Sequence, residues 1–334
     1  MSKILSLCSG YGGLDLAVEE HFTGSHTAYW SDIDPSACDI MTARFPDAEP
    51  VGDLTQFGDT AFDCDILTAG YPCQPFSHAG KRLGEDDERH LWPYIANTIG
   101  VSRPRWVILE NVAGHVNLGG PAVVGTLTEM GYSVRWGVVR AFDAGAPHQR
   151  KRLFIVANAS SERHGGRQDV GLVAELDRGE KKTTQQRQRS RKEFVYRGTT
   201  TTNTNSEGLE GQRTQHELRE ASEETDTAWS SYARAIQRWE QALGRPAEFR
   251  ECLSETNWGE YGTAINRWEH ILGRSAPPPV EDNKLSASFV EWMMGLEKNW
   301  VCGVVESRAK ALKVLGNGVV KQQARLALEL ICDE

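Results

Sequence analysis

The apolar positions in the first half of the chain form short runs separated by stretches with helical spacing. Strands are predicted at 4–8, 27–31, 64–69, 106–109, 133–139 and 153–157. The segment 14–21 between the first two strands has its apolar residues on one helical face. Strands that alternate with helices at this spacing build a mostly parallel sheet covered on both sides. We therefore predict an α/β fold with a doubly wound, Rossmann-like sheet.

The pattern changes after residue 157. Residues 158–228 are polar and have little periodicity, which predicts a flexible or loosely folded insertion. Two similar segments follow, 229–245 and 258–274, each with Tyr, Ile, Trp and Leu on one helical face and a Gly at the end. They predict two small helical units packed on each other.

The last part of the chain is again helical. Helices are predicted at 288–294 and 321–332, with the segment Leu315–Val319 between them. The predicted organisation is an α/β domain at 1–157, which also carries the candidate catalytic and cofactor-binding motifs described below, an inserted, partly flexible region at 158–283, and a C-terminal segment at 284–334 that returns to the first domain.

Charge and cysteine usage narrow the setting of the protein. The formal net charge is −9, yet residues 178–193 hold seven Lys/Arg against two Glu, so a basic patch can exist on an acidic chain. No apolar run approaches 18 residues, and the chain opens directly on a strand pattern, so we expect neither a signal peptide nor a membrane span. Seven scattered cysteines without a C-x-x-C pair indicate a reducing cytoplasm and no metal site.

A glycine-rich turn follows the first predicted strand. Ser9-Gly10-Tyr11-Gly12-Gly13 allows backbone N–H groups to approach a ligand closely. Asp32 stands 19 residues after Gly13, where an acid typically binds ribose hydroxyls. An ordinary strand-to-helix turn explains the same pattern equally well, and the glycine spacing differs from the dinucleotide fingerprint, which argues against NAD.

The loop around Cys73 indicates a nucleophile. Cys73 lies between Pro72 and Pro75, just past a strand end, at the usual ligand edge of an α/β sheet. The alternative is a small buried hydrophobic residue, the usual role of a lone cysteine. The polar, proline-constrained loop favours the nucleophile.

Charged residues near two later strands are candidates for the same edge. Glu110 follows the strand at 106–109, and because parallel strands share one carboxyl edge, it can face the crevice of Cys73. The alternative for Glu110 is an acid at a helix N-terminus. Arg150 and Arg152 precede the strand at 153–157 and should point together, either onto phosphate or a base carbonyl, or into solvent.

Taken in order, these motifs resemble the cytosine-C5 DNA methyltransferase family. The resemblance covers roughly residues 3–157 and 284–330. It rests on Pro72-Cys73-Gln74, Glu110-Asn111-Val112 and Gln149-Arg150-Lys151-Arg152, and on Gly316-Asn317-Gly318-Val319, which is similar to the closing motif of that family. The resemblance implies a methyltransferase of Rossmann-like fold that uses S-adenosylmethionine, with an inserted target-recognition region.

The resemblance also implies roles for individual residues. Cys73 would attack C6 of cytosine, Glu110 would hold N3, and Arg152 would contact O2, with Arg150 supporting the loop. The residues implied to bind the cofactor are Ser9, Gly10, Gly12 and Gly13 at its methionine end, Asp32 at the ribose, Ile33, Asp53 and Leu54 at the adenine, and Asn317 at the end of the pocket. Two positions depart from the family pattern, because Ser6 replaces a common acid and Ile33 a common aromatic.

Contacts with double-stranded DNA are expected from the cysteine loop and from region 158–283. The candidates are Gln74, Ser77, Arg238, Arg245, Arg267 and Arg274. Trp239 and Trp268 are interpreted as helix core rather than stacking platforms. The protein is expected to be a monomer in the cytoplasm of a bacterium or a phage-infected host, and a separately acting restriction endonuclease stays open as a partner.

The implied reaction is methyl transfer to C5 of a cytosine in a specific DNA sequence, through a covalent Cys73–C6 adduct on a flipped base. Two alternatives stay open: an RNA cytosine-C5 methyltransferase and a non-catalytic DNA-binding relative. Methylation of adenine N6 is disfavoured, because its Asp/Asn-Pro-Pro-aromatic loop is absent from the sequence.

Overall fold

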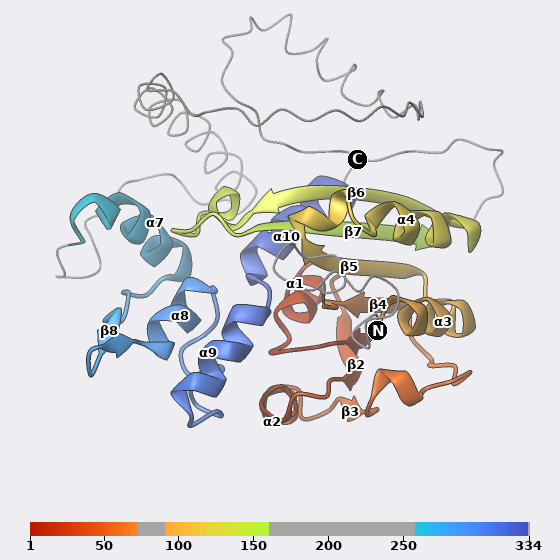
Figure 1. The fold of residues 1–334 in the computed structure, drawn as a ribbon, viewed down its shortest axis with the longest axis horizontal. Coiled ribbons are helices and arrows are strands. Elements are labelled where there is room, and N and C mark those ends of the chain that lie inside the picture. The colour runs from red at the N-terminus through yellow and green to blue at the C-terminus, as the bar shows by residue number, and fades with distance from the viewer. Residues whose placement is uncertain (73–90, 160–257, 333–334) are drawn as a thin grey trace, which may run out of the picture.

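A seven-stranded sheet forms the centre of the molecule (Figure 1). The computed structural model describes residues 1–72, 91–159 and 258–332. The strands are β1 (Ser2–Leu7), β2 (Ser25–Ser31), β3 (Glu49–Pro50), β4 (Ile66–Ala69), β5 (Trp106–Val112), β6 (Tyr132–Arg140) and β7 (Lys151–Ala159). Their order in the sheet is β3-β2-β1-β4-β5-β7-β6. The first five are parallel, and β7 runs antiparallel to both β5 and β6. The predicted mostly parallel, doubly wound sheet is confirmed.

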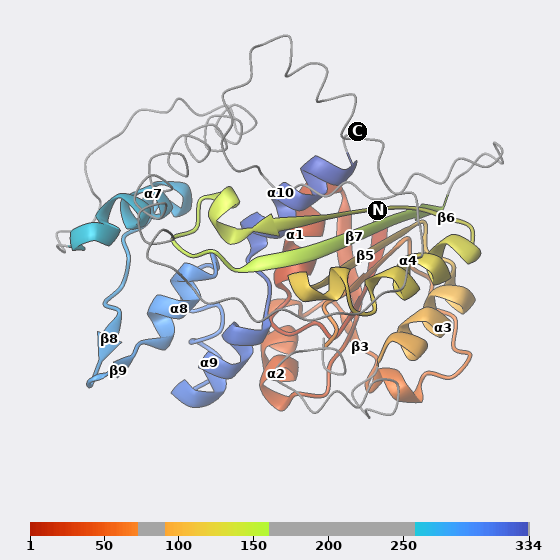
Figure 2. The same ribbon diagram turned by 45° about the horizontal axis from the view of Figure 1, so that its top comes forward.

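Helices cover both faces of this sheet (Figure 2). The helices in the first half are α1 (Gly13–His21), α2 (Pro35–Arg44), α3 (Trp92–Ser102) and α4 (Gly120–Glu129), with short 3-10 turns η1 (Leu54–Gln56), η3 (Ala113–Val116) and η4 (Ala141–Ala144). One face packs against α3 and α4, and the other against α1 and the terminal helix α10 (Lys321–Cys332).

Strand β1 shows why its apolar run is continuous. Ile4 points into the core beside α1 and α10, whereas Leu5 and Leu7 point into the core beside α3 and α4. All three side chains are buried because successive residues of a strand face opposite sides of a sheet. This double burial holds the carboxyl end of β1, where the glycine turn begins, in the middle of the molecule.

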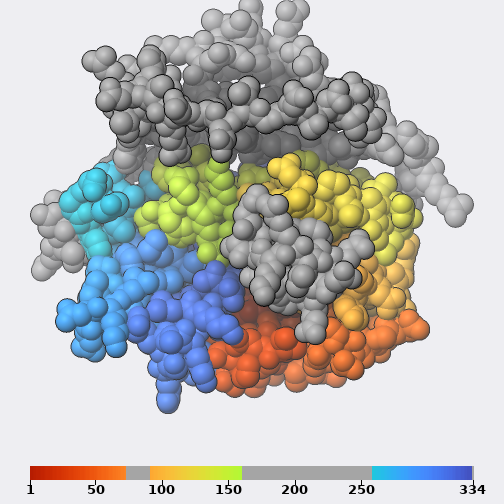
Figure 3. All heavy atoms as spheres, in the orientation of Figure 1, coloured from red at the N-terminus to blue at the C-terminus, as the bar shows by residue number. Residues whose placement is uncertain are grey.

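The C-terminal elements pack beside the sheet and return to it. They are η5 (Gly259–Tyr261), α7 (Gly262–Leu272), the hairpin β8 (Val280–Glu281) and β9 (Lys284–Leu285), α8 (Ala287–Met293), α9 (Arg308–Asn317) and α10. In the space-filling view the blue C-terminal residues abut the red N-terminal ones (Figure 3). The Trp300 indole N–H donates to the Tyr11 carbonyl at 2.9 Å, and Arg44 Nε donates to the Trp300 carbonyl at 2.9 Å.

Two elements differ from the sequence-based expectation. Strand β5 continues to Val112 instead of ending at 109, because its residues 110–112 pair with 152–154 of the antiparallel strand β7. Residues 315–317, which stand between the two predicted helices, belong to helix α9. That helix was missed because it buries few apolar side chains, chiefly Ala311, Val314 and Leu315, and carries Gly at its end.

Of the two predicted helical units, the structure describes only the second, at 258–274. The segment predicted at 258–274 contains η5 and α7, and Gly273 ends α7 with φ +66°, as expected for a glycine C-cap. The first copy, 229–245, lies outside the described residues, so the packing of the two units stays a prediction. The division at 157 and 283 also stays a prediction.

In the described ranges, no helix combines the length and apolar character needed to cross a bilayer.

Glu291 at the centre of the C-terminal elements provides a test of their packing. Its buried carboxylate accepts hydrogen bonds from the backbone N–H groups of Asn299, Val301 and Cys302 at 2.7–2.8 Å. Replacing Glu291 by Ala leaves these donors without their acceptor. We expect the free energy of unfolding, measured by urea denaturation, to fall by about 3 kcal/mol.

The exposed Glu297 offers a matched control. Glu297→Ala should change the free energy of unfolding by no more than about 0.5 kcal/mol. Equal effects of the two substitutions would show that the carboxylate of Glu291 does not hold this segment together.

Candidate active site

A cavity of about 640 Å³ opens at the carboxyl edge of the parallel strands. Its wall contains the ends of β1, β2, β4 and β5 and the last turn of α9 with the residues after it. Most of the predicted cofactor residues line it, namely Ser9, Gly10, Gly13, Asp32, Ile33, Asp53, Leu54 and Asn317, together with Glu110 and Arg152. The fold therefore brings most of the residues predicted to bind the cofactor into one cavity.

Several predicted residues are not part of this wall. Gly12 and Arg150 lie next to the cavity without lining it. Cys73, Gln74, Ser77, Arg238 and Arg245 lie outside the described residues. Their predicted roles stay predictions.

The glycine turn is shaped by close packing on two sides. Gly10 and Gly12 have φ of +59° and +78°, in the left-handed region that favours glycine. A Cβ on Gly12 would collide with the ring of Phe45, and a Cβ on Gly13 would lie 2.5 Å from the carbonyl oxygen of Val319. Gly12 thus serves packing against α2, whereas Gly10 and Gly13 expose backbone to the cavity.

Two carboxylates face the cavity near the turn. Asp32 Oδ2 accepts from the Gly10 N–H and Oδ1 from the Asp34 N–H, both at 2.8 Å. Burial raises the pKa of Asp32. Asp53 caps η1 by accepting from the N–H and the hydroxyl of Thr55 at 2.9 Å. Each acid is therefore held in place by backbone, with further lone pairs left for a ligand.

Glu110 and Arg152 form an ion pair inside the cavity. Glu110 Oε1 lies 2.7 Å from Arg152 Nε, and their side chains are 7% and 17% exposed. The antiparallel pairing of β5 and β7 brings them together, because Val112 is opposite Arg152. Burial raises the pKa of Glu110 to about 7, and Arg152 counteracts part of that rise. Glu110 can therefore hold or release a proton near neutral pH.

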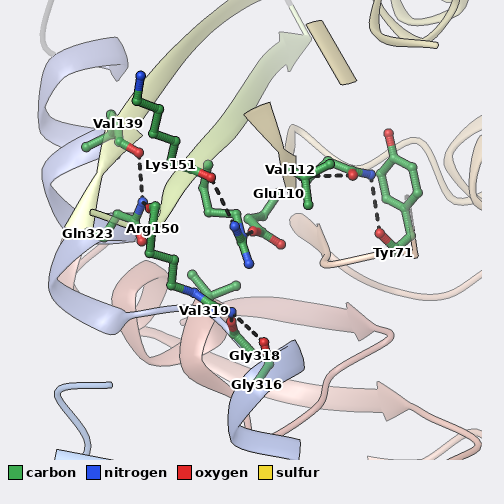
Figure 4. Close-up of polar contacts among 12 residues, drawn as sticks. Tyr71, Glu110, Val112, Val139, Arg150, Lys151, Gly316, Gly318, Val319 and Gln323 are labelled. Carbon is green, nitrogen blue, oxygen red and sulfur yellow. Dashed lines mark hydrogen bonds and ion pairs between the residues drawn. The ribbon is translucent and has the colours of Figure 1, made fainter. Parts of the chain in front are cut away.

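Arg150 has other partners than Arg152, and its side chain reaches toward the closing segment at Gly318 (Figure 4). Its Nη2 donates to the carbonyls of Gly316 at 2.8 Å and Gly318 at 2.5 Å. We expected the two arginines to point together, and this expectation is wrong. Strand alternation does not apply to Arg150, because β7 begins at Lys151 and Arg150 has φ +26°. Arg150 supports the closing segment of the cavity instead of reaching into it.

Further contacts hold the closing segment and the elements next to it. Tyr11 Oη donates to the Val319 carbonyl at 2.5 Å. Gln323 Nε2 of α10 donates to the carbonyls of Arg150 at 2.8 Å and Val139 at 2.7 Å. Lys313 on α9 pairs with Asp34 at 2.7 Å, which links α9 to the loop after β2. Residues separated by some 300 positions in the chain thus build one wall.

A buried hydrogen bond between Tyr71 and His115 was not predicted from the sequence. Tyr71 Oη lies 2.9 Å from His115 Nε2, and the Asn111 side chain donates to the Tyr71 carbonyl at 3.2 Å. Burial lowers the pKa of His115 to about 4, so its ring is neutral at neutral pH. Nothing in the spacing of Tyr71 and His115 predicts this contact, which depends on the pairing of β4 with β5.

Arg267 in α7 and Arg274 just after it contact other parts of the protein. Arg267 is 8% exposed, its Nε donates to the Gly145 carbonyl at 3.0 Å, and its guanidinium lies over the Phe142 ring. We expected Arg267 to contact DNA, and the structure corrects this, because α7 is buried at Arg267 as well as at the core residues Ile265 and Trp268. Arg274 is half-buried and donates to the Leu296 carbonyl.

Trp268 behaves as a core residue. It is fully buried, and its indole N–H donates to the Trp292 carbonyl at 2.9 Å. The interpretation of Trp268 as helix core is consistent with this packing, whereas Trp239 lies outside the described residues.

Comparison with known proteins identifies the family. The model of the C-5 cytosine-specific DNA methylases matches residues 2–331. The chain belongs to this family. Among the relatives of the chain, the type II methyltransferase M.NlaIV of Neisseria lactamica is 35% identical over 178 residues, which are 48% of the chain and 42% of the relative. The type II methyltransferase M.HhaI of Haemophilus parahaemolyticus is 36% identical over 160 residues, which are 46% of the chain and 48% of the relative. The chain thus spans less than half the length of these relatives.

Solved structures show the same fold. A DNMT2 variant of Spodoptera frugiperda aligns with 99% of both chains at a TM-score of 0.55 and 16% identity. The Dnmt2 methyltransferase of S. pombe aligns equally widely at a TM-score of 0.54 and 16% identity. The family consists of S-adenosylmethionine-dependent methyltransferases, and most of the residues predicted to bind this cofactor line the cavity of the chain.

The Glu110–Arg152 ion pair can be tested through the pKa of Glu110. Arg152→Gln removes the cation that lowers the pKa of Glu110, so this pKa should rise above about 7. The titration of the ¹³C-labelled glutamate side chain by NMR measures it. Arg135→Gln is the control, since the Arg135 guanidinium donates to the Ile331 carbonyl. A pKa of Glu110 that is the same in both variants would contradict the assigned pair.

The support that Arg150 gives to the closing segment can be tested through the affinity for the cofactor. Arg150→Met removes the donors to Gly316 and Gly318 and loosens the wall that they form. The dissociation constant for S-adenosylmethionine, measured by calorimetry, should rise about tenfold. The neighbouring Lys151 is exposed, and Lys151→Met should leave the constant unchanged. Equal constants for both variants would remove the support role from Arg150.

Proposed function

We propose that the protein transfers a methyl group from S-adenosylmethionine to C5 of a cytosine in double-stranded DNA, with Cys73 as nucleophile. One observation carries the proposal: the Glu110–Arg152 pair, the carboxylates Asp32 and Asp53, and Pro72 share one cavity. A single peptide bond joins Pro72 to Cys73. Family membership and the type II methyltransferases among the relatives support the same activity.

The cavity fits the cofactor. Its volume of about 640 Å³ lies in the range of small-molecule sites. A side chain on Gly13 would collide with Tyr11 and Val319, so this glycine lets the backbone of the turn lie close to the closing segment at the cavity wall. Ser9, Gly10 and Gly13 would hold the methionine end, with Gly12 shaping the turn. Asp32 would hold the ribose hydroxyls, Asp53 the adenine amino group, and Ile33, Leu54 and Asn317 the remaining surface. S-adenosylmethionine supplies an electrophilic methyl group when bound.

The residues of the chain would activate the cytosine. The Cys73 thiolate forms a bond to C6, and the electrons of the C5–C6 double bond move to C5. Glu110, with a pKa near 7, holds a proton at N3 and so stabilises this adduct. Arg152 contacts the base O2. Once C5 carries the methyl group, its proton would be lost to a base and the thiolate would leave C6, which restores the C5–C6 double bond.

Access to the base requires that it leave the duplex. Flipping a cytosine out of the stack costs a few kcal/mol. We propose that Gln74, Ser77, Arg238 and Arg245 contact the DNA. Arg274 stays a candidate with a half-buried side chain, and Arg267 is withdrawn because it is buried.

The biological setting is proposed from the relatives. Several are type II methyltransferases of bacteria. A separately acting endonuclease that recognises the same sequence is therefore the proposed partner. A monomer in the cytoplasm of a bacterial or phage-infected cell is the proposed state.

The test is base-resolution methylation sequencing of DNA from cells that express the chain. We expect 5-methylcytosine at a defined sequence and none with Cys73→Ala. Cys302→Ala, a substitution of a half-buried cysteine beside Glu291, is the control and should methylate normally. Methylation that survives Cys73→Ala would overturn the mechanism.

Trapping on defined nucleic acids tests the substrate. A 5-fluorocytosine DNA duplex should form a covalent adduct with the protein and S-adenosylmethionine, and Cys73→Ala should form none. An adduct with 5-fluorocytosine RNA but not with DNA would replace the proposal by the RNA-directed alternative. No adduct with either would favour a non-catalytic relative.

A further inference from the structure

Asp15 is a buried acid that the proposed chemistry does not use. It lies in the first turn of α1, is 1% exposed, and lines the cavity. Its Oδ2 accepts from the Ser6 hydroxyl at 2.8 Å, and its Oδ1 accepts from the Thr68 hydroxyl at 2.5 Å. Ser6 and Thr68 are direct neighbours on β1 and β4, so the two strands hold the carboxylate from one side.

The order of the strands places Asp15 at a defined point of the cavity. From β3 to β5 the acids along the sheet edge are Asp53 after β3, Asp32 and Asp34 after β2, Asp15 over β1 and β4, and Glu110 on β5. The proposed nucleoside contacts are at one end of this row and the proposed base contact at the other. The reacting methyl group must lie between them, which is where Asp15 is held.

Among the residues that the structure describes, no cation is one of the groups that shift the pKa of Asp15 most. Burial raises the pKa of Asp15 to about 6, and the main opposing effects come from the Thr68 and Ser6 hydroxyls. The charged group that acts on it most is another acid, Glu19. Arg152 and Lys313, two cations of the cavity wall, pair with Glu110 and Asp34. Because a buried charge is stabilised by an opposite charge, this acid is suited to a cationic ligand.

We propose that Asp15 binds the positively charged methionine end of S-adenosylmethionine and makes the cavity prefer this cofactor over S-adenosylhomocysteine. This inference rests on the proposed function. The cofactor carries a sulfonium charge that the demethylated product lacks, so a nearby carboxylate attracts the former more strongly. The loss of this attraction after methyl transfer favours exchange of the spent product.

Ser6 links Asp15 to the glycine turn. Its hydroxyl donates to Asp15 at the carboxyl end of β1. Ser6 Oγ also lies 2.8 Å from Ser9 Oγ in the glycine turn.

Calorimetric titration with S-adenosylmethionine and with S-adenosylhomocysteine tests the inference. At pH 7.5, Asp15→Asn should raise the dissociation constant for S-adenosylmethionine about tenfold and that for S-adenosylhomocysteine less than threefold. Asp39→Asn, at an exposed position of α2, is the matched control and should change neither. Equal losses for both ligands, or no loss for either, would overturn the assignment and leave Asp15 a structural brace.

Proton release gives a second readout. Binding of a cation lowers the pKa of Asp15, so at pH 6 the protein should release protons when S-adenosylmethionine binds. The titratable and charged groups on the elements around Asp15 are Glu19, Glu20 and His21 on α1, Asp32 after β2, Asp65 before β4, Glu110 on β5, and Lys321, Arg325 and Glu329 on α10. Glu110 titrates in the same range, so the measurement is made in Glu110→Gln with and without Asp15→Asn.

The binding enthalpy in two buffers of different ionisation enthalpy measures this release. We expect release from Glu110→Gln and much less from the double variant; equal release would overturn the assignment. Thr68→Val provides an independent variant that keeps the carboxylate, and losing this donor should move the release to higher pH. If the wild-type protein bound no S-adenosylmethionine, the proposed function itself would fail; if it bound normally and Asp15→Asn kept its ligand preference, this inference alone would fail.

Discussion

The antiparallel pairing of β7 with β5 is the constraint on which the site depends. It sets Arg152 opposite Val112 and so brings its guanidinium to Glu110, which lies within β5. A parallel strand at this position would present its other end to the cavity and leave Glu110 as a buried acid without a cation. The pair keeps the pKa of Glu110 near neutrality, below the value that burial alone would give. The chemistry proposed at N3 of cytosine therefore follows from strand direction.

The same region couples the base site to the cofactor site. Arg150, two residues from Arg152, holds the carbonyls of Gly316 and Gly318, while Gln323 of α10 holds the Arg150 carbonyl. Tyr11 in the glycine turn holds Val319 from the other side. Because each contact ends on a backbone carbonyl, the closing segment is fixed in position and its side chains stay available to the cavity. The acids Asp32, Asp15 and Glu110 follow this edge in the order in which the proposed ligands would meet them.

Much of the site was predictable because its residues follow strand ends. Asp32 and Glu110 come at the ends of apolar runs, and parallel strands bring such ends to one edge whatever the helices between them. Arg150 and Arg267 were misplaced for a different reason. A left-handed φ at Arg150 and a buried helix face at Arg267 override the simple periodicities of two and 3.6. The hydrogen bond of Tyr71 to His115 joins residues whose spacing carries no signal.

The sequence by itself determined the sheet, the positions of its parallel strand ends, and the set of chemical groups at them. Apolar runs and turn residues are local, and burial of those runs on both faces leaves few other arrangements. Only the tertiary structure decided the partners of these groups: Arg152 for Glu110, the closing carbonyls for Arg150, and the hydroxyls of Ser6 and Thr68 for Asp15. Such contacts depend on strand register and on the return of α9 and α10 to the first strands, which are non-local and therefore absent from any pattern along the chain.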